Sequence, residues 1–168
     1  IASFYKGSGL SASRPTTAKL SQALPLKLME VGEDGPSSVH SVVEVLLHQG
    51  LASRKPKVVL NSVNLVLDAA KSFGAGALPV ASVASSAPKI LGHSNAKVRE
   101  AGMNIIAEIC RALGSKEPLQ SVMATLKPAQ MSQLDGLLEK QRGPTQPKIG
   151  LRYGKNRGDK TDGPDDVL

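Results

Sequence analysis

The chain repeats one short pattern three times, as SRPTTAK (Ser13–Lys19), SRKPKVV (Ser53–Val59) and SNAKVRE (Ser94–Glu100). Lys57 and Lys97 are 40 residues apart, and Pro15 precedes Pro56 by 41. Each copy opens an amphipathic stretch of about one helix and follows another apolar stretch, which is the layout of a two-helix HEAT or armadillo repeat. Such repeats bury their apolar faces only by stacking. The pattern therefore predicts an all-α solenoid of antiparallel helix pairs.

The composition agrees with a helical domain. The 168 residues suffice for one domain of ordinary size, and 40% of them are hydrophobic, with four aromatics and no Trp. A core of Leu, Val, Ile and Ala without large rings suits close-packed helices better than a β-sandwich. No apolar run reaches the length of a membrane span, and we expect an intracellular protein without a membrane partner. We expect the single cysteine, Cys110, to be a buried small hydrophobe.

Helix periodicity and punctuation predict the boundaries of individual elements. Asn95 is the expected N-cap of the last long helix, and Pro25 and Pro88 are expected to kink, break or bend their helices. One helix should carry its apolar residues on one side, at Val39, Val42, Val43, Leu46 and Leu47. The remaining predicted helices are Pro15–Val31, Pro56 to near Gly74, Leu78–Gly92, Ala96–Leu113, Leu119–Leu126 and Pro128–Arg142.

The helix Ala96–Leu113 has the clearest pattern. Its predicted packing stripe is Val98, Ala101, Ile105, Ile109 and Ala112. The stripe expected to face water is Glu100, Asn104, Glu108 and Arg111. Gly114 should end this helix, just as Gly74–Pro79 should end an earlier helix in a turn.

The two ends of the sequence differ from the repeats. Ile1–Lys6 reads as the end of a helix without a Met ahead of it, so we expect the domain to be truncated at its N-terminus. Gly7–Ser13 is predicted to be a loop and Gly32–Ser38 a turn. From Gly143 the chain is rich in Gly, Pro and charge without a usable period. We therefore expect a helical domain over residues 1–142 and a flexible basic linker over 143–168.

Catalytic motifs are missing from the sequence. It has no phosphate-binding Gly loop with Lys-Ser/Thr, no paired cysteines, no HExxH and no Gly-x-Ser-x-Gly elbow. His40, His48 and His93 lack a second close ligand for a metal site. We expect a binding protein rather than an enzyme, needing no cofactor and no metal.

Basic residues gather at the recurring corners between helices, where the chain concentrates a third of its Lys and Arg within a formal charge of +7. The residues are Arg14, Lys19, Arg54, Lys55, Lys57, Lys97 and Arg99. Cations near a helix N-terminus oppose the helix dipole, at roughly a few tenths of a kcal/mol each. A locally unfavourable feature that is repeated tends to mark function, although a merely solvated surface is the simpler alternative. Stacking should align these corners into a basic ridge suited to an acidic surface.

Three runs of sequence resemble the later repeats of a TOG domain, a tubulin-binding HEAT array of the microtubule polymerase family. They are VLLHQGLASRKPKVVLNSVNLVLDAAKSFGAGALPV (45–80), APKILGHSNAKVREAGMNIIAEICRALG (87–114) and LKPAQMSQLDGLLEK (126–140). The last is similar to the end of the first TOG domain of that family. The resemblance covers about Pro15 to Lys140, but the Trp that the family usually places in its first loop has no counterpart here.

The resemblance implies binding of αβ-tubulin through the loop inside each repeat, in a protein that acts at growing microtubule plus ends. Carried over by position, Lys57 and Arg99 match basic contact residues of the family, and we expect both side chains to be exposed. Their neighbours Arg54, Lys55, Asn95 and Lys97 join this predicted site, and so do Arg14 and Lys19 in a less faithful loop. The implied location is the cytoplasm, on microtubules, the spindle and the microtubule-organising centre.

Two other functions remain open from the residues. A HEAT adaptor or scaffold of another kind, such as a transport receptor or phosphatase scaffold, would use acidic or apolar contacts on its concave helices. A nucleic-acid-binding module would use the basic ridge to hold phosphates, but the chain lacks aromatics on which bases could stack, so we expect no specific nucleic acid partner.

Overall fold

The fold comes from a computed structural model that describes residue 10, residues 14–32, residues 38–140 and residue 147. Within these residues the chain is helical and has no strand, which confirms the predicted all-α class. The elements are α2 (Pro15–Val31), α3 (Val39–Val45), η2 (Leu46–Gly50), α4 (Pro56–Phe73), η3 (Ala75–Ala77), α5 (Val80–Leu91), α6 (Ala96–Leu113), η4 (Glu117–Leu119), α7 (Gln120–Met123) and α8 (Pro128–Lys140).

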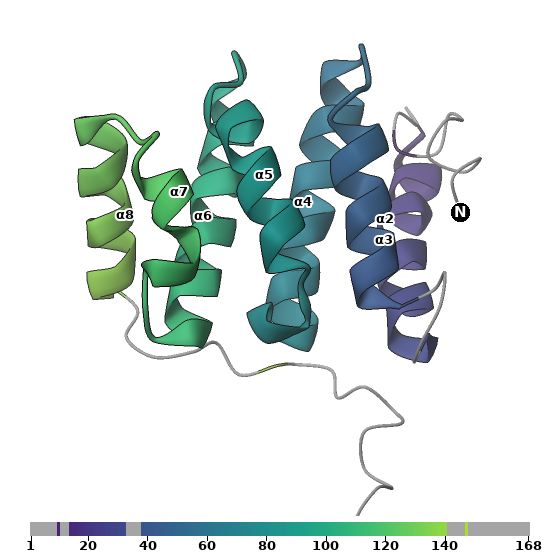
Figure 1. Cartoon of the computed structure of the whole chain (residues 1–168). Helices are drawn as coiled ribbons and strands as arrows, with labels where there is room; N and C mark the ends of the chain where they lie inside the picture. Colours follow the sequence, from purple (N-terminus) through teal and green to yellow (C-terminus); the bar gives the residue numbers. More distant parts are fainter. Residues whose placement is uncertain (1–9, 11–13, 33–37, 141–146, 148–168) are drawn as a thin grey trace, which may run out of the picture.

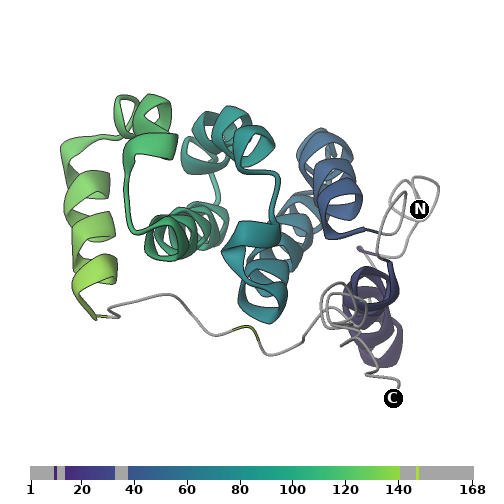
Figure 2. The same ribbon diagram turned by 60° about the horizontal axis from the view of Figure 1, so that its bottom comes forward.

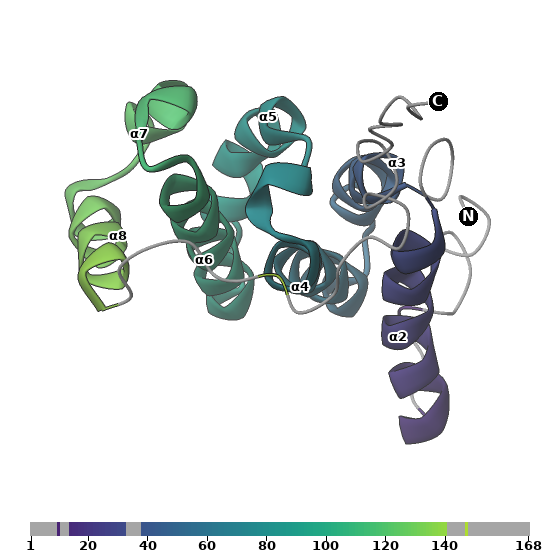
Figure 3. The same cartoon turned by 90° about the horizontal axis from the view of Figure 1, so that it is seen from below.

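The helices form two layers of a solenoid. Figure 3 shows α3, α5 and α7 in one layer and α2, α4, α6 and α8 in the other. Each helix of the first layer turns back into a helix of the second, and the pairs succeed one another along the molecule (Figure 1). α4 and α6 lie side by side and contact each other (Figure 2), as predicted for second helices of adjacent repeats.

α4 shows how the sequence sets its own boundaries. Pro56 is its first residue, where the missing N–H would have no helical partner. Val59, Val63 and Val66 are buried on its inner side. The helix ends at Phe73, and Gly74 follows with φ 87°, which supports the prediction that this glycine is a terminator.

α6 packs against α4, α5 and α8. Asn95 caps it by accepting a hydrogen bond from the backbone N–H of Lys97 at 2.9 Å, as predicted. Gly114 ends it in the left-handed conformation at φ 65°, which glycine adopts without strain. Within α6, Gly102 permits close packing, since an added Cβ would lie 2.3 Å from Cγ2 of Ile90 on α5.

The predicted wet stripe of α6 is wrong at two positions. The side chains of Glu108 and Arg111 are only 5% and 7% exposed, and Arg111 Nη2 lies 2.5 Å from Glu108 Oε1. Arg111 Nη1 also donates to the carbonyl of Leu137 on α8 at 3.5 Å. Ala112, expected in the packing stripe, is exposed. The reason is that α6 contacts α4, α5 and α8, so more than one of its faces is covered.

The helix predicted from Val39 onward is present but irregular. Its predicted stripe of Val39, Val42, Val43, Leu46 and Leu47 is buried. The turn Leu46–Gly50 is π-helical rather than α-helical, which the sequence pattern did not indicate. Gly50 lies so close to α4 that an added Cβ would be 2.2 Å from Ser62 Oγ.

α2 has the predicted bounds, Pro15–Val31, and exposes apolar surface. The helix continues without a break through Pro25, which is buried. Leu20 and Leu24 are 65% and 45% exposed, and they line a shallow apolar hollow on the helix.

Among the described residues, no helix combines the length and the apolarity needed to cross a membrane.

Several predictions fall on other parts of the chain. The helix end at Ile1–Lys6 lies outside the described residues, as do the turn residues 33–37 and all of the linker except Pro147. In the predicted loop Gly7–Ser13, Leu10 is described. It is buried and its carbonyl accepts a hydrogen bond from Asn61 Nδ2 at 2.6 Å.

The C-terminal pair of helices is shorter at its start than predicted. Leu119–Leu126 becomes the single turns η4 and α7, whereas α8 begins at Pro128 as expected. Leu134 of α8 is fully buried, and Leu137 and Leu138 pack against the core from partly buried positions.

Cys110 of α6 is buried as predicted. Burial raises the pKa of its thiol above the ordinary value of 9.0, while the charges of Lys116 and Arg111 act to lower it.

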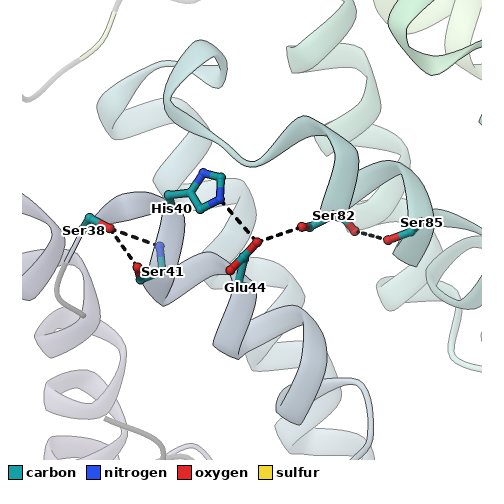
Figure 4. A network of polar contacts seen from close by, with 6 residues as sticks. All are labelled: Ser38, His40, Ser41, Glu44, Ser82 and Ser85. Carbon is teal, nitrogen blue, oxygen red and sulfur yellow. Dashed lines mark hydrogen bonds and ion pairs between the residues drawn. The ribbon is translucent and has the colours of Figure 1, made fainter. Parts of the chain in front are cut away.

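A polar network joins the first helices of two repeats (Figure 4). Glu44 Oε1 of α3 accepts a hydrogen bond from Ser82 Oγ of α5 at 3.1 Å and lies 3.3 Å from His40 Nε2. Ser85 donates in turn to the carbonyl of Ser82 at 3.0 Å. Ser38 caps α3 by accepting from the backbone N–H of Ser41. These contacts help to hold α5 beside α3.

Candidate binding edge

The predicted site residues lie where second-layer helices begin. α2, α4, α6 and α8 all start at the upper edge of the molecule in Figure 1, so the turns that precede them lie along one side of the solenoid. We call this side of the solenoid the basic edge. Its predicted site residues are Arg14, Lys19, Arg54, Lys55, Lys57, Asn95, Lys97 and Arg99.

The turn before α4 presents three basic side chains to solvent. Arg54, Lys55 and Lys57 are all exposed. Their backbone is ordered by local hydrogen bonds, since Ser53 Oγ accepts from the N–H of Lys55 at 3.2 Å. The carbonyl of Lys55, the N-cap, accepts from the N–H of Val58 at 2.9 Å. The three cations therefore stand at the positive end of α4, on a turn with a defined shape.

The turn before α6 is organised around Arg99. Arg99 Nη1 donates to the carbonyls of His93 and Ser94, both at 2.8 Å. His93 Nδ1 accepts from the backbone N–H of Asn95 at 3.0 Å. Arg99 is half-buried, so the expectation that it is exposed is wrong, whereas Lys97 is exposed. Arg99 therefore holds the shape of this turn through its hydrogen bonds, whereas the side chain of Lys97 points into solvent.

The third predicted corner is at the start of α2. Arg14 precedes the helix in an extended conformation, without a side-chain cap, and Lys19 lies in the second turn. Both are exposed. α2 contacts α3 and α4. The eight predicted residues thus stand in three groups, at the starts of α2, α4 and α6.

A fourth turn on this edge was not among the predicted site residues. Lys127 precedes α8, and its backbone N–H donates to Gln130 Oε1 at 3.1 Å. Gln130 Nε2 donates to the carbonyl of Leu91 on α5 at 3.2 Å, which ties this turn to the preceding repeat. The sequence carried a signal, because Lys127-Pro128 repeats the pair Lys55-Pro56.

The chemistry available at the basic edge is positive charge and hydrogen-bond donation. Four helix N-termini and the basic side chains point their positive ends to the same side. Glu100, at the start of α6, is the acidic residue within residues 51–57 and 93–100. No three His, Cys, Asp or Glu side chains in the described ranges are placed to hold a metal ion together.

Comparison with known proteins places this solenoid in a family. A sequence model of the family "XMAP215/Dis1/CLASP, TOG domain" matches residues 6–138. The chain therefore belongs to the TOG domains of that family, as the resemblance of its three sequence runs implied.

Individual relatives agree with this assignment. The chain is 29% identical over 123 residues to Centrosomal protein 224 of Dictyostelium discoideum, and 25% identical over 113 residues to Protein MOR1 of Oryza sativa subsp. japonica. These matches cover 73% and 66% of the chain but only 6% and 5% of the two relatives. The chain thus spans a small part of the length of these proteins.

Two solved structures share the fold. One belongs to a study of tubulin recruitment and assembly by microtubule polymerases with Tumor Overexpressed Gene (TOG) domain arrays; its TM-score is 0.75 at 23% identity, over 89% of this chain and 31% of that one. The other is TOG3 of Drosophila melanogaster Mini spindles, with a TM-score of 0.70 at 18% identity, over 88% of this chain and 61% of that one. Both likenesses support the two-layer helical solenoid.

Proposed function

We propose that this chain binds αβ-tubulin through the basic edge, as a non-enzymatic part of a microtubule-associated protein that promotes microtubule growth and organisation. The observation that carries the proposal is the equivalent placing of Lys57 and Lys97, each the second residue of its helix and each exposed. Membership of the TOG family supports tubulin as the partner. A neighbour in fold comes from work on tubulin recruitment by microtubule polymerases.

The proposed interface is ionic. Exposed cations at aligned helix N-termini favour an extended acidic surface, and charge-assisted hydrogen bonds are the strong contacts of such an interface. We assign residues 1–142 to the tubulin-binding domain and residues 143–168 to a basic linker. The proposed site of action is the cytoplasmic microtubule array, with the spindle, the organising centre and growing plus ends. This chain needs no cofactor of its own in the proposed role.

Charge reversal at the two equivalent lysines tests the proposal. The variant Lys57→Glu/Lys97→Glu should weaken binding of the chain to labelled tubulin, measured by fluorescence titration, at least about a hundredfold. The matched control is Lys71→Glu/Lys140→Glu, which makes the same change of charge in the last turns of α4 and α8, at the ends of these helices opposite to the basic edge. Circular dichroism should show both variants to be folded.

The control decides between specific and general electrostatics. If the two double variants weaken binding equally, total charge and not the basic edge governs the interaction. If the edge variant is folded and binds like the parent, the proposed interface is wrong. An adaptor that uses its concave helices then becomes the better explanation of the fold.

A further inference from the structure

A groove separates the turn before α6 from the turn before α8. It has a volume of about 510 Å³ and lies between the α5–α6 turn and the start of α8. Its polar lining comes from both turns: His93, Ser94, Arg99, Thr125, Lys127 and Gln130. None of its lining residues is acidic, so any electrostatic preference of the groove is for anions.

The walls of this groove are held by hydrogen bonds. Gln130 bridges them, because its Oε1 accepts from Lys127 and its Nε2 donates to Leu91 on the opposite wall. Gly92 adjoins the same wall, and an added Cβ there would lie 3.0 Å from the carbonyl oxygen of Pro88. A preformed groove loses less binding free energy to the ordering of its own side chains.

Arg99 retains donor groups after organising its turn. Its Nη1 makes the bonds to His93 and Ser94, while Nη2 and Nε have no hydrogen-bond partner within the described part of the chain. Lys127 Nζ likewise forms no ion pair or hydrogen bond with described residues. A guanidinium with free N–H groups and a nearby ammonium suit carboxylates, the first through paired hydrogen bonds and the second as a point charge.

We propose that this groove binds an extended acidic peptide segment, with Arg99 and Lys127 as the carboxylate-binding side chains. The inference rests on the proposed function in that the segment would belong to the same partner. Charge complementarity selects the occupant. The groove has room for an extended backbone, offers cations on both walls, and has no aromatic lining residue on which a nucleic-acid base would stack.

The test is a titration of the full chain with two peptides, one alternating Glu with Gly and the other alternating Gln with Gly. Amide resonances of Ser94 and Thr125 should shift with the Glu peptide and stay in place with the Gln peptide. Lys127→Glu should weaken the Glu peptide at least about tenfold, because it replaces an attraction with a repulsion. Lys89→Glu is the matched control, since Lys89 is exposed on α5 but lines a different groove. It should leave the affinity within about twofold.

Each outcome bears on the proposal separately from the tubulin assay. Shifts confined to residues outside the groove, or equal weakening by Lys127→Glu and Lys89→Glu, would overturn it. A short oligothymidine that occupies the groove more tightly than the Glu peptide would also overturn the choice of a carboxylate ligand. If the parent binds tubulin but not the Glu peptide, only the groove inference fails. If it binds the Glu peptide through Lys127 but not tubulin, the groove remains and the proposed function fails.

Discussion

Lys57 and Lys97 occupy the same position in successive repeats, as the second residues of α4 and α6, and both are exposed at the same edge of the solenoid. The two helices contact each other along the second layer. The sequence separation of 40 residues is therefore the length of one structural repeat. This equivalence makes the pair the natural subject of the first binding experiment.

Single truncation of either lysine should weaken tubulin binding without loss of stability. We expect Lys57→Ala and Lys97→Ala each to cost roughly 1.5–3 kcal/mol of binding free energy, because each removes a charge-assisted contact. The unfolding midpoint in urea should stay unchanged, since both side chains are exposed. Parent affinity should fall as salt rises, with charges screened over about 8 Å at physiological ionic strength. Binding that is insensitive to salt would contradict an ionic interface.

Arg99 should behave differently from the lysines. Arg99→Ala removes both hydrogen bonds to the His93 and Ser94 carbonyls, so we expect it to lower the free energy of unfolding by about 1 kcal/mol, a value reduced for partial exposure. The amide resonances of residues 93–95 should move in this variant and remain in place in Lys97→Ala. Arg99→Lys keeps the charge but should not restore both bonds. Unchanged resonances in Arg99→Ala would show that the arginine does not organise the turn.

The buried pair between Glu108 and Arg111 gives a stability prediction. Glu108→Ala should destabilise the chain by about 3–5 kcal/mol in urea unfolding, because it leaves a buried guanidinium without its partner. The double variant Glu108→Leu/Arg111→Met fills similar volume without charge and should cost much less than the two single truncations together. Strict additivity of the two positions would mean that the pair is not coupled.

Cys110 should make stability decline at alkaline pH. Burial raises the pKa of this thiol in the folded chain, so the folded state holds its proton when the unfolded state has lost it. This contribution to stability is complete below the unfolded pKa and is lost as pH rises towards the folded pKa. Urea unfolding between pH 8 and 10 should therefore fall less steeply in Cys110→Ala than in the parent. An identical decline in both would assign the pH dependence to other groups.

Much of the fold follows from local signals in the sequence. Pro56 and Asn95 mark helix starts because their own chemistry suits the first turn, and Gly114 ends a helix by its backbone freedom. The burial of Glu108 had no such signal. Helical periodicity reports one apolar stripe, whereas three neighbouring helices cover α6. In the sequence, the charged residues Glu108 and Arg111 look solvent-exposed, although they form a buried ion pair on the same helix.

The candidate site was predicted less completely for a similar reason. Repetition located the corners of α2, α4 and α6, but it did not distinguish a side chain that faces solvent from one that folds back. Arg99 bonds to carbonyls of its own turn, and this depends on the path of residues 93–95. Lys127 belongs to a shorter repeat whose preceding helix is a single turn, so the 40-residue spacing did not extend to it.

Because the helix pairs stack on one another, the spacing of the turns along the basic edge depends on the interfaces between the pairs. The principal contacts of each helix pair are with the pairs beside it, so a pull on one turn passes to the next through their shared interface. Close approaches such as Gly102 against Ile90 make the joint within a pair stiff. The extensive contact between α4 and α6 fixes how these two helices sit beside each other. The spacing of Lys57 and Lys97 along the edge is therefore set by the stacking of the repeats and not by the turns themselves.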